Sequence, residues 1–392
     1  MTDAPDLVIR GGSIADGKGG DLFEADVAIR DGRIAEVGKV AGRGKEEIDA
    51  RGKLVTPGFV DVHTHYDGQV TWSQDITPSS QNGVTTAIMG NCGVGFAPCK
   101  PSDHTRLIQL MEGVEDIPEP VLSAGIPWQW ESFPDYMNWL SKRNFDIDIG
   151  AQLPHAALRV YVMGERGARR DPSTAEDNKA MAQLAAEAVR AGALGFSTSR
   201  TLNHRTSTGD FTPTLKAGED ELTAIAAGMQ AQGRSVLQFV LDLSTIDEDL
   251  PMMLRVADNT KCPITFSITQ NDRAPRRWRQ TLDEIGAATA RGLSITAQIA
   301  ARPVGLLLGL ELSRNPFQTH PAILSERASP TDDPLFFKPN YDKIYLLGNP
   351  PDYEQPPENA LGALARKQGI KPEELAYDAM LSDEGRGMLY VP

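Results

Sequence analysis

Short hydrophobic runs separated by turn residues occupy the first 57 positions of the chain. Residues 25–30 alternate apolar and polar side chains, and Asp31-Gly32 then favours a tight hairpin into residues 33–38. Further short apolar runs lie at 7–10, 48–50 and 54–55. The pattern predicts a small antiparallel β-sheet module over residues 1–57.

From residue 58 onward, apolar runs alternate with segments of helical periodicity. The expected strands are 58–65, 85–92, 147–153, 194–199, 236–241, 264–269 and 293–300. The expected helices are 133–143, 173–191, 219–232, 250–258, 281–291 and 372–381. This alternation is typical of a parallel sheet covered by helices. It predicts an α/β fold in which residues 58–392 form a TIM-type (β/α)8 barrel whose eighth strand is not evident.

Two local signals add detail to the barrel prediction. Ser173, followed three residues later by Glu176, is typical of a capping box at the start of a helix. Residues 97–131 contain five prolines and no strand pattern. They are predicted to form a long irregular insertion, of the kind that serves as a lid or a pocket wall.

The first expected barrel strand carries candidate metal ligands. Side chains two apart on a strand share one face, so Asp61, His63 and His65 are expected to point one way. Val60 and the other intervening residues are expected to face the surrounding helices. Two imidazoles about 7 Å apart along a strand can hold one metal ion, and imidazole suits zinc, iron and nickel.

Composition narrows the classes of partner. The formal net charge of −14 and the pI near 5.0 argue against a nucleic-acid partner, which requires clustered Lys and Arg. Three cysteines do not support a disulfide framework. The N-terminus does not have the pattern of a signal peptide, and no apolar run is long enough to span a membrane. We therefore expect a soluble cytoplasmic protein without a membrane partner.

Two motifs resemble a known family. The run from Pro57 to His65 resembles the first-strand signature of the amidohydrolase superfamily. The run from Asn91 to Pro98 is similar to the Gly-Asn-Cys-Gly segment of the N-acyl-D-amino-acid deacylase (D-aminoacylase) branch. The resemblance implies that Cys92 takes the place of a modified lysine. It also implies that His63, His65 and Cys92 hold one zinc ion, and that C-terminal strands complete the N-terminal module.

The chain departs from the family pattern at three points. The family has histidines at the ends of strands five and six, where this chain has Gln238-Phe239 and Ser267-Ile268. The family's general base, an aspartate after strand eight, has no counterpart, so no catalytic residue is assigned. Two explanations stay open: the chain is the N-terminal part of a longer enzyme, or it is a degenerate relative. Two forms of association also stay open: a homo-oligomer, and a complex with a complementary C-terminal chain.

Polar residues after the fourth and seventh expected strands are candidate substrate-binding groups. Arg200 and His204 follow the fourth strand, and Arg302 follows the seventh. A guanidinium can bind a carboxylate with two parallel hydrogen bonds, and an imidazole can donate a hydrogen bond or exchange a proton. His155, after the third strand, is expected to be a structural histidine.

The resemblance implies a metal-dependent hydrolase of a carbon-nitrogen bond that removes the N-acyl group from a D-amino acid or a similar small-molecule amide. One alternative is a hydrolase of cyclic amides such as hydantoins or lactams. The other is a non-catalytic relative or subunit that has kept the barrel and lost the site. The missing histidines of strands five and six favour the last alternative.

Overall fold

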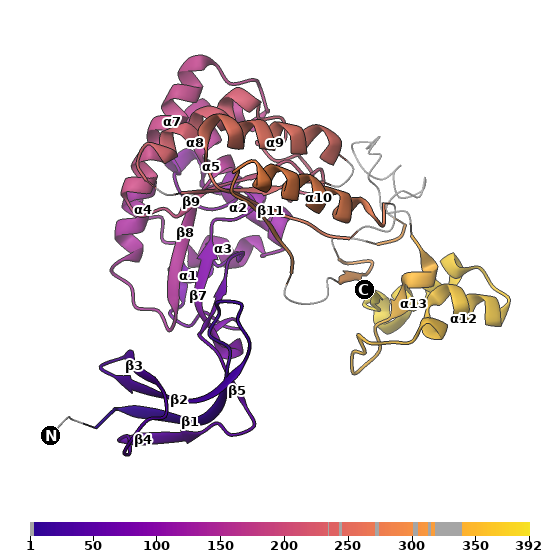
Figure 1. The fold of residues 1–392 in the computed structure, drawn as a ribbon. Helices are drawn as coiled ribbons and strands as arrows, with labels where there is room; N and C mark the ends of the chain where they lie inside the picture. Colours follow the sequence, from indigo (N-terminus) through magenta and orange to yellow (C-terminus); the bar gives the residue numbers. More distant parts are fainter. Residues whose placement is uncertain are drawn as a thin grey trace. The chain divides into compact units, whose positions relative to one another are not determined.

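The computed structural model describes residues 4–233, 235–242, 245–270, 274–300, 305–312, 315–317 and 339–392. The chain divides into two compact units. The first comprises Met1–Thr64, Ser73–Met89 and Asn144–Gly150, and the second comprises His65–Trp72, Gly90–Arg143 and Ala151–Pro392. Figure 1 shows the elements along the chain. The boundary between residues 57 and 58 that the sequence suggested stays a prediction.

The N-terminal strands form one sheet of order β3-β2-β1-β4, with β5 also paired to β1. Its strands are β1 (Leu7–Ile14), β2 (Phe23–Arg30), β3 (Arg33–Gly38), β4 (Glu46–Asp49) and β5 (Leu54–Val55). Asp31 and Gly32 both have positive φ, as the predicted hairpin turn requires. The prediction of an antiparallel sheet was wrong for β4 and β5. These two strands run parallel to successive halves of β1, on either side of an irregularity in its pairing with β2.

Seven strands form the second sheet, as predicted. They are β6 (Phe59–Asp61), β7 (Val84–Met89), β8 (Asp148–Pro154), β9 (Gly195–Ser199), β10 (Val236–Val240), β11 (Ile264–Ser267) and β12 (Ile295–Gln298), and they follow one another in sequence order. The pairings from β8 through β12 are parallel, as is that of β6 with β7. All five residues of β9 are buried, as expected for a parallel strand covered on both faces. No eighth strand joins this sheet within the described ranges.

Strand β6 is shorter and more exposed than predicted. It spans only Phe59–Asp61, and Val60 and Val62 are 57% and 47% exposed. The expectation that these valines lie buried against helices was therefore wrong. The physical reason is that β6 is an edge strand, paired on one side only among the described residues.

Helices follow most strands of the second sheet. They are α1 (Gln69–Trp72), α4 (Phe133–Leu140), α5 (His155–Met163), α6 (Glu165–Ala168), α7 (Ala175–Arg190), α8 (Glu219–Gln230), α9 (Ile246–Thr260) and α10 (Arg277–Ala290). Helices α7, α8 and α9 pack side by side (Figure 1). The predicted capping box is displaced by one residue: Thr174 is the cap and Asp177 its partner, not Ser173 and Glu176. Within the described ranges, no helix has both the length and the apolar character needed to cross a membrane.

The segment 97–131 is more ordered than predicted. It contains helices α2 (His104–Glu115) and α3 (Glu119–Gly125), so the prediction of an irregular insertion was wrong. Its prolines misled the prediction because several lie at helix starts, where a missing N–H costs nothing. The indole of Trp130 is buried and donates a hydrogen bond to the carbonyl of Phe96 at 2.8 Å, which anchors this segment.

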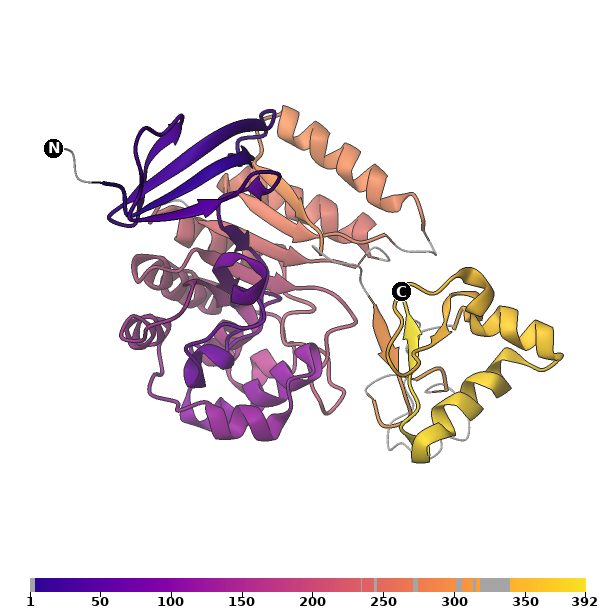
Figure 2. The same ribbon diagram turned by 90° about the horizontal axis from the view of Figure 1, so that it is seen from below.

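The end of the chain builds a small core of its own that the sequence did not reveal. Strands β13 (Leu306–Leu308), β14 (Tyr345–Leu346) and β15 (Leu389–Val391) form an antiparallel sheet of order β13-β15-β14. Helices α12 (Leu361–Gln368) and α13 (Pro372–Gly385) accompany it and are drawn in yellow tones in Figure 2. The buried residues are Leu308, Ile344, Leu361, Ala376, Met380 and Leu389. The remaining short elements are 3-10 helices at Ser80–Asn82, Pro101–Asp103, Tyr341–Lys343 and Pro357–Asn359.

A buried ionic network links helix α5 and strand β9 to helix α8. The ring nitrogens of His155 contact Thr198 Oγ1 and Glu221 Oε1, each at 2.8 Å. The guanidinium of Arg159 donates to the same carboxylate oxygen at 2.9 Å. All of these residues are almost inaccessible to solvent. His155 is therefore a structural histidine, as predicted.

Gly90 connects β7 to the turn that follows it. Its φ is +78°, and a Cβ at this position would lie 2.2 Å from the carbonyl oxygen of Gln152. Both the left-handed backbone and the close approach exclude a side chain here. Gly209 has a comparable φ of +91° but open space around the corresponding Cβ position.

Gly90→Ala should therefore destabilise the protein more than Gly209→Ala. The left-handed conformation should cost each variant about 1–2 kcal/mol, and overpacking should add about 1–3 kcal/mol to Gly90→Ala alone. Urea unfolding of both variants measures the difference. Equal losses would show that the contact with Gln152 is relieved at no cost.

Glu221→Gln should lower the free energy of unfolding by about 3–5 kcal/mol at neutral pH, because it leaves Arg159 buried without its partner. The control is Glu219→Gln on the same helix as Glu221. It breaks a more exposed ion pair with Arg255 of α9 and should lower the free energy of unfolding by about 0–1 kcal/mol. Thermal or urea unfolding of the two variants makes the comparison.

The same network predicts a loss of stability in acid. Burial acts to raise the pKa of Glu221, but the hydrogen bond from His155 and the charges nearby outweigh it and lower this pKa from 4.5 to about 2. This contribution is thus present above pH 4.5 and should be lost as the pH falls toward 2. Burial also lowers the pKa of His155 below 6.5, so its share of the loss begins near that pH. Urea midpoints measured across this range should fall more steeply for the native protein than for Glu221→Gln.

Candidate metal centre

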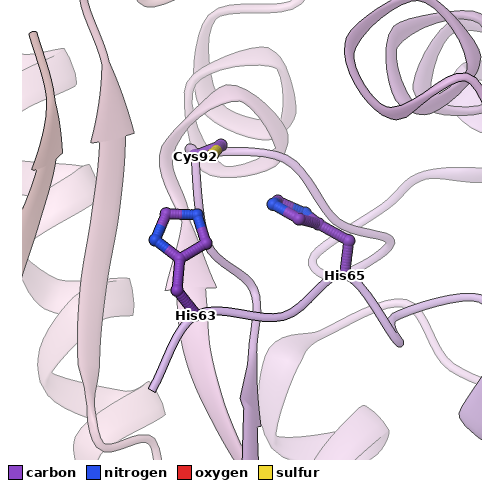
Figure 3. Close-up of side chains that lie close together, drawn as sticks. All are labelled: His63, His65 and Cys92. Carbon is purple, nitrogen blue, oxygen red and sulfur yellow. The ribbon is translucent and has the colours of Figure 1, made fainter. Parts of the chain in front are cut away.

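The two candidate histidines lie just beyond β6 rather than on it. The backbone N–H of His63 donates to Asp61 Oδ1 at 3.2 Å. The backbone N–H and the hydroxyl of Thr64 both donate to the carbonyl of Ile88, at 2.9 and 2.8 Å. Thr64 is thereby buried against β7, while its neighbours His63 and His65 both point toward Cys92 (Figure 3). The alternation expected of a strand therefore persists after the strand has ended.

Cys92 lies in a tight turn after β7 that three other strand ends support. Its φ is +56°, an uncommon value for a residue with a side chain. Its N–H donates to the side chain of Gln238 at 3.2 Å, and the N–H of the following residue donates to the hydroxyl of Ser197 at 2.9 Å. The side-chain amide of Gln152 donates to Asn91 at 2.8 Å. These buried contacts from β8, β9 and β10 fix the position of the thiol.

His63, His65 and Cys92 come together as the sequence predicted. One potential ligand atom from each lies within 4.8 Å of the others, and Figure 3 shows the three side chains converging. Two imidazoles and a thiol are donors that zinc accepts, at about 2.0–2.1 Å for nitrogen and 2.3 Å for sulfur. The donor set therefore fits zinc after small side-chain adjustments. The role of these residues as metal ligands stays a prediction.

Two buried carboxyl groups beside this cluster were missed by the sequence analysis. Glu115 places Oε1 3.2 Å from Nε2 of His65, and its side chain is 19% exposed. Asp67 is 3% exposed, and no described residue hydrogen-bonds its Oδ2. Glu115 ends helix α2 within the segment predicted to be irregular, so the sequence held no signal for it. Asp67 could have been found from its spacing of two residues after His65.

The electrostatic environment of the cluster is acidic. Burial raises the pKa of Asp67 to about 7 against backbone hydrogen bonds that lower it. Burial, together with repulsion from the negative charges of Asp67 and Asp116, raises the pKa of Glu115 to about 8. Burial and the charges of Glu115 and Asp67 also raise the pKa of the Cys92 thiol well above its usual value. A bound divalent metal reverses such shifts, because its charge stabilises thiolate and carboxylate.

Two of the three predicted substrate-binding residues, Arg200 and His204, lie among the described residues and differ from one another in their contacts. Arg200 donates from Nε to Asp249 at 2.7 Å and from Nη1 to the carbonyl of Ala217 at 2.6 Å, so part of its guanidinium ties β9 to α9. His204 Nδ1 contacts the hydroxyl of Ser199 at 2.9 Å, at the carboxyl end of β9. Arg302 lies outside the described residues. The substrate-binding role of all three stays a prediction.

Gln238, with Phe239, lies where the resemblance implies the histidine of strand five. Its side chain is fully buried: Oε1 accepts from the backbone N–H of Cys92 and Nε2 donates to the carbonyl of Phe239. Ser267 is the last residue of β11, the sixth strand of the sheet. The side chain of Gln238 therefore supports the Cys92 turn by accepting a hydrogen bond from the backbone of Cys92.

Known proteins share the fold and resemble the sequence of this chain. A crystal structure of D-aminoacylase superposes with a TM-score of 0.63 over 99% of this chain and 71% of that one, at 24% identity. The N-acyl-D-glutamate deacylase of Bordetella bronchiseptica, solved with zinc and a phosphonate inhibitor, superposes equally well over 99% and 72% of the two chains, also at 24% identity. At these identities the comparison establishes the fold alone.

Sequence comparison gives the relationship. The N-acyl-D-aspartate deacylase of Alcaligenes xylosoxydans xylosoxydans is 31% identical over 302 residues, which are 74% of this chain and 55% of that protein. The D-aminoacylase of the same organism is 29% identical over 290 residues, 73% and 55% of the two chains. The chain thus spans about half the length of these curated relatives. The model of the amidohydrolase family matches residues 46–373, and this chain belongs to that family.

Proposed function

We propose that this chain carries the metal centre of a hydrolase that removes the N-acyl group from a D-amino acid or a similar small amide. The observation that carries the proposal is the convergence of His63, His65 and Cys92 to within 4.8 Å. Support also comes from relatives that are named N-acyl-D-aspartate deacylase, N-acyl-D-glutamate deacylase and D-aminoacylase. The proposed substrate class follows from the names of the relatives, and the proposed metal-dependent chemistry follows from the cluster.

The three side chains would hold one zinc ion through two imidazole nitrogens and one thiolate. When bound, the metal supplies a Lewis acid that polarises an amide carbonyl and lowers the pKa of a water molecule to about 7. The hydrogen bonds around Cys92 orient the thiol in the absence of metal, which would reduce the reorganisation that binding requires. His204, held by Ser199 at the carboxyl end of β9, would donate a hydrogen bond to the substrate.

The names of two relatives point to substrates with an additional carboxylate. Such a substrate needs a cationic or hydrogen-bonding partner, and Arg200, His204 and Arg302 are the residues proposed for that role. Arg200 has two nitrogens engaged by Asp249 and Ala217, so it would contribute its remaining hydrogen-bonding capacity from a fixed position.

One observation favours a non-catalytic relative as the second candidate. The resemblance implies a ligating histidine where the chain has Gln238-Phe239 on strand five, and Gln238 is engaged with the backbone of Cys92. A chain that has lost this ligand and the strand-six histidine could retain the fold without turnover. The two candidates differ in whether the zinc-loaded chain hydrolyses an N-acyl-D-amino acid.

Purified protein should bind about one zinc ion per chain and release D-aspartate or D-glutamate from the N-acetyl compounds, and removal of the metal by a chelator should abolish turnover. His63→Ala, His65→Ala and Cys92→Ser should each weaken metal binding strongly, because each removes one of the three side chains proposed to hold the ion. The control is Cys262→Ser, another buried free cysteine outside the cluster.

Metal content is measured by elemental analysis and turnover by chromatography of the released amino acid. Full activity of folded, metal-free protein would overturn the proposal. Stoichiometric zinc without hydrolysis of any N-acyl or cyclic amide would establish the non-catalytic alternative.

His204→Gln should raise KM for an N-acyl-D-amino acid by about 10-fold or more with a smaller change in kcat, as expected for the loss of binding common to ground state and transition state. The metal content should not change. Steady-state kinetics on the zinc-loaded chain measure both constants. A fall in kcat at constant KM would assign His204 to the chemical step instead.

A further inference from the structure

A carboxylate from outside the sheet reaches the metal cluster. Glu115 is the last residue of α2, fifty positions beyond His65 in the sequence. Its Oε1 lies 3.2 Å from Nε2 of His65, and four-fifths of its side chain is withdrawn from solvent. The helix ends at this residue because Asp116 turns left-handed, with φ of +54°. The backbone thereby fixes the point at which the carboxylate enters the cluster.

The separation of the two side chains suits a shared metal ion. Two donors on a tetrahedral zinc, each about 2.0–2.2 Å from the metal, are roughly 3.3–3.5 Å apart. The distance of 3.2 Å between Oε1 of Glu115 and Nε2 of His65 is close to this value. Figure 3 shows the ring of His65 directed toward His63 and Cys92. A metal among these three side chains therefore lies within reach of the carboxylate.

The acidic groups beside the cluster also favour the binding of a cation there. Buried carboxylates are normally paired with a cation or coordinate a metal. Asp67, Cys92 and Glu115 are three acidic groups withdrawn from solvent beside one another. Oδ2 of Asp67 has no hydrogen-bond partner among the described residues. A divalent ion would compensate the charges of these groups in their ionised forms.

The family pattern leaves a place for an additional ligand. The resemblance implies histidines where the chain has Gln238-Phe239 and Ser267-Ile268, and Gln238 is engaged with the Cys92 turn. Of the ligands that zinc commonly takes, a carboxylate completes a set that already holds two imidazoles and a thiol. Catalytic zinc sites sometimes expand to five ligands, so a protein carboxylate is compatible with the entry of a substrate oxygen.

We propose that Glu115 is the fourth protein ligand of this metal centre, supplied by helix α2 in place of the strand-end histidines that the chain lacks. The inference rests on the metal site of the proposed function. It differs from that function in naming a ligand outside the barrel strands. It also assigns a metal-binding task to the segment between the second and third strands of the sheet.

The test compares Glu115→Gln with Glu112→Gln, which makes the same change of charge one turn earlier on the same helix. Glu112 accepts a hydrogen bond from the N–H of Glu119, which a glutamine can also accept. Zinc affinity is measured on the full chain by competition with a chromophoric chelator, and Co²⁺ absorption reports the ligand set. Glu115→Gln should weaken affinity by roughly 100-fold or more, since even partners outside the ligand set change affinity by 10–100-fold. Glu112→Gln should bind as the native chain does.

Added acetate gives a second measurement that a structural role would not affect. If Glu115→Gln opens a coordination position, acetate should fill it and restore the native Co²⁺ spectrum, and it should leave the spectrum of the native chain unchanged. Native affinity in Glu115→Gln would overturn the inference, and so would weaker affinity with an unchanged spectrum. Loss of metal in His63→Ala in the same experiment would show that the proposed metal site stands even if Glu115 is not part of it.

Discussion

The left-handed turn at Cys92 is the constraint on which the site depends. A residue with a side chain pays about 1–2 kcal/mol to adopt this conformation, so the surroundings must hold it there. They do so through Gln152, Ser197 and Gln238, which contribute buried hydrogen bonds from three successive strands. Strands β8, β9 and β10 are thereby tied to the turn that carries the thiol. The geometry of the cluster is a property of the sheet and not of a single loop.

Two buried polar clusters in this protein have opposite electrostatic character. In the first, Glu221 has Arg159 and His155 against the same oxygen, so its negative charge is compensated and its pKa is low. In the second, Glu115 and Cys92 are buried among acids, and their pKa values are raised. The first arrangement favours stability, because the charges are paired within the fold. The second brings acidic groups together, and a bound cation, as in the proposed metal site, would compensate their charges.

The sequence was sufficient for those features that depend on local pattern. Alternating strands and helices predicted the seven-stranded sheet, and the spacing of His63 and His65 with the Cys92 motif predicted the cluster. It was insufficient where distant segments meet. Glu115 reaches His65 from the end of a helix, and no periodicity marks a carboxylate for that position. The C-terminal sheet pairs Leu307 with residues more than 80 positions later, and short strands of that kind carry little signal.

Gln238 shows how a strand end can support the cluster without joining it. The resemblance implies a histidine where the chain has Gln238-Phe239 at the end of strand five, and the glutamine directs its carbonyl to the N–H of Cys92. Its side chain therefore acts on the position of a candidate ligand. In the proposed metal centre, coordination would come from the ends of the first two strands and from helix α2, where His65 and Glu115 meet. Such a centre would not require the later strands to supply ligands. Their buried side chains would instead hold the Cys92 turn, through hydrogen bonds such as those of Ser197 and Gln152.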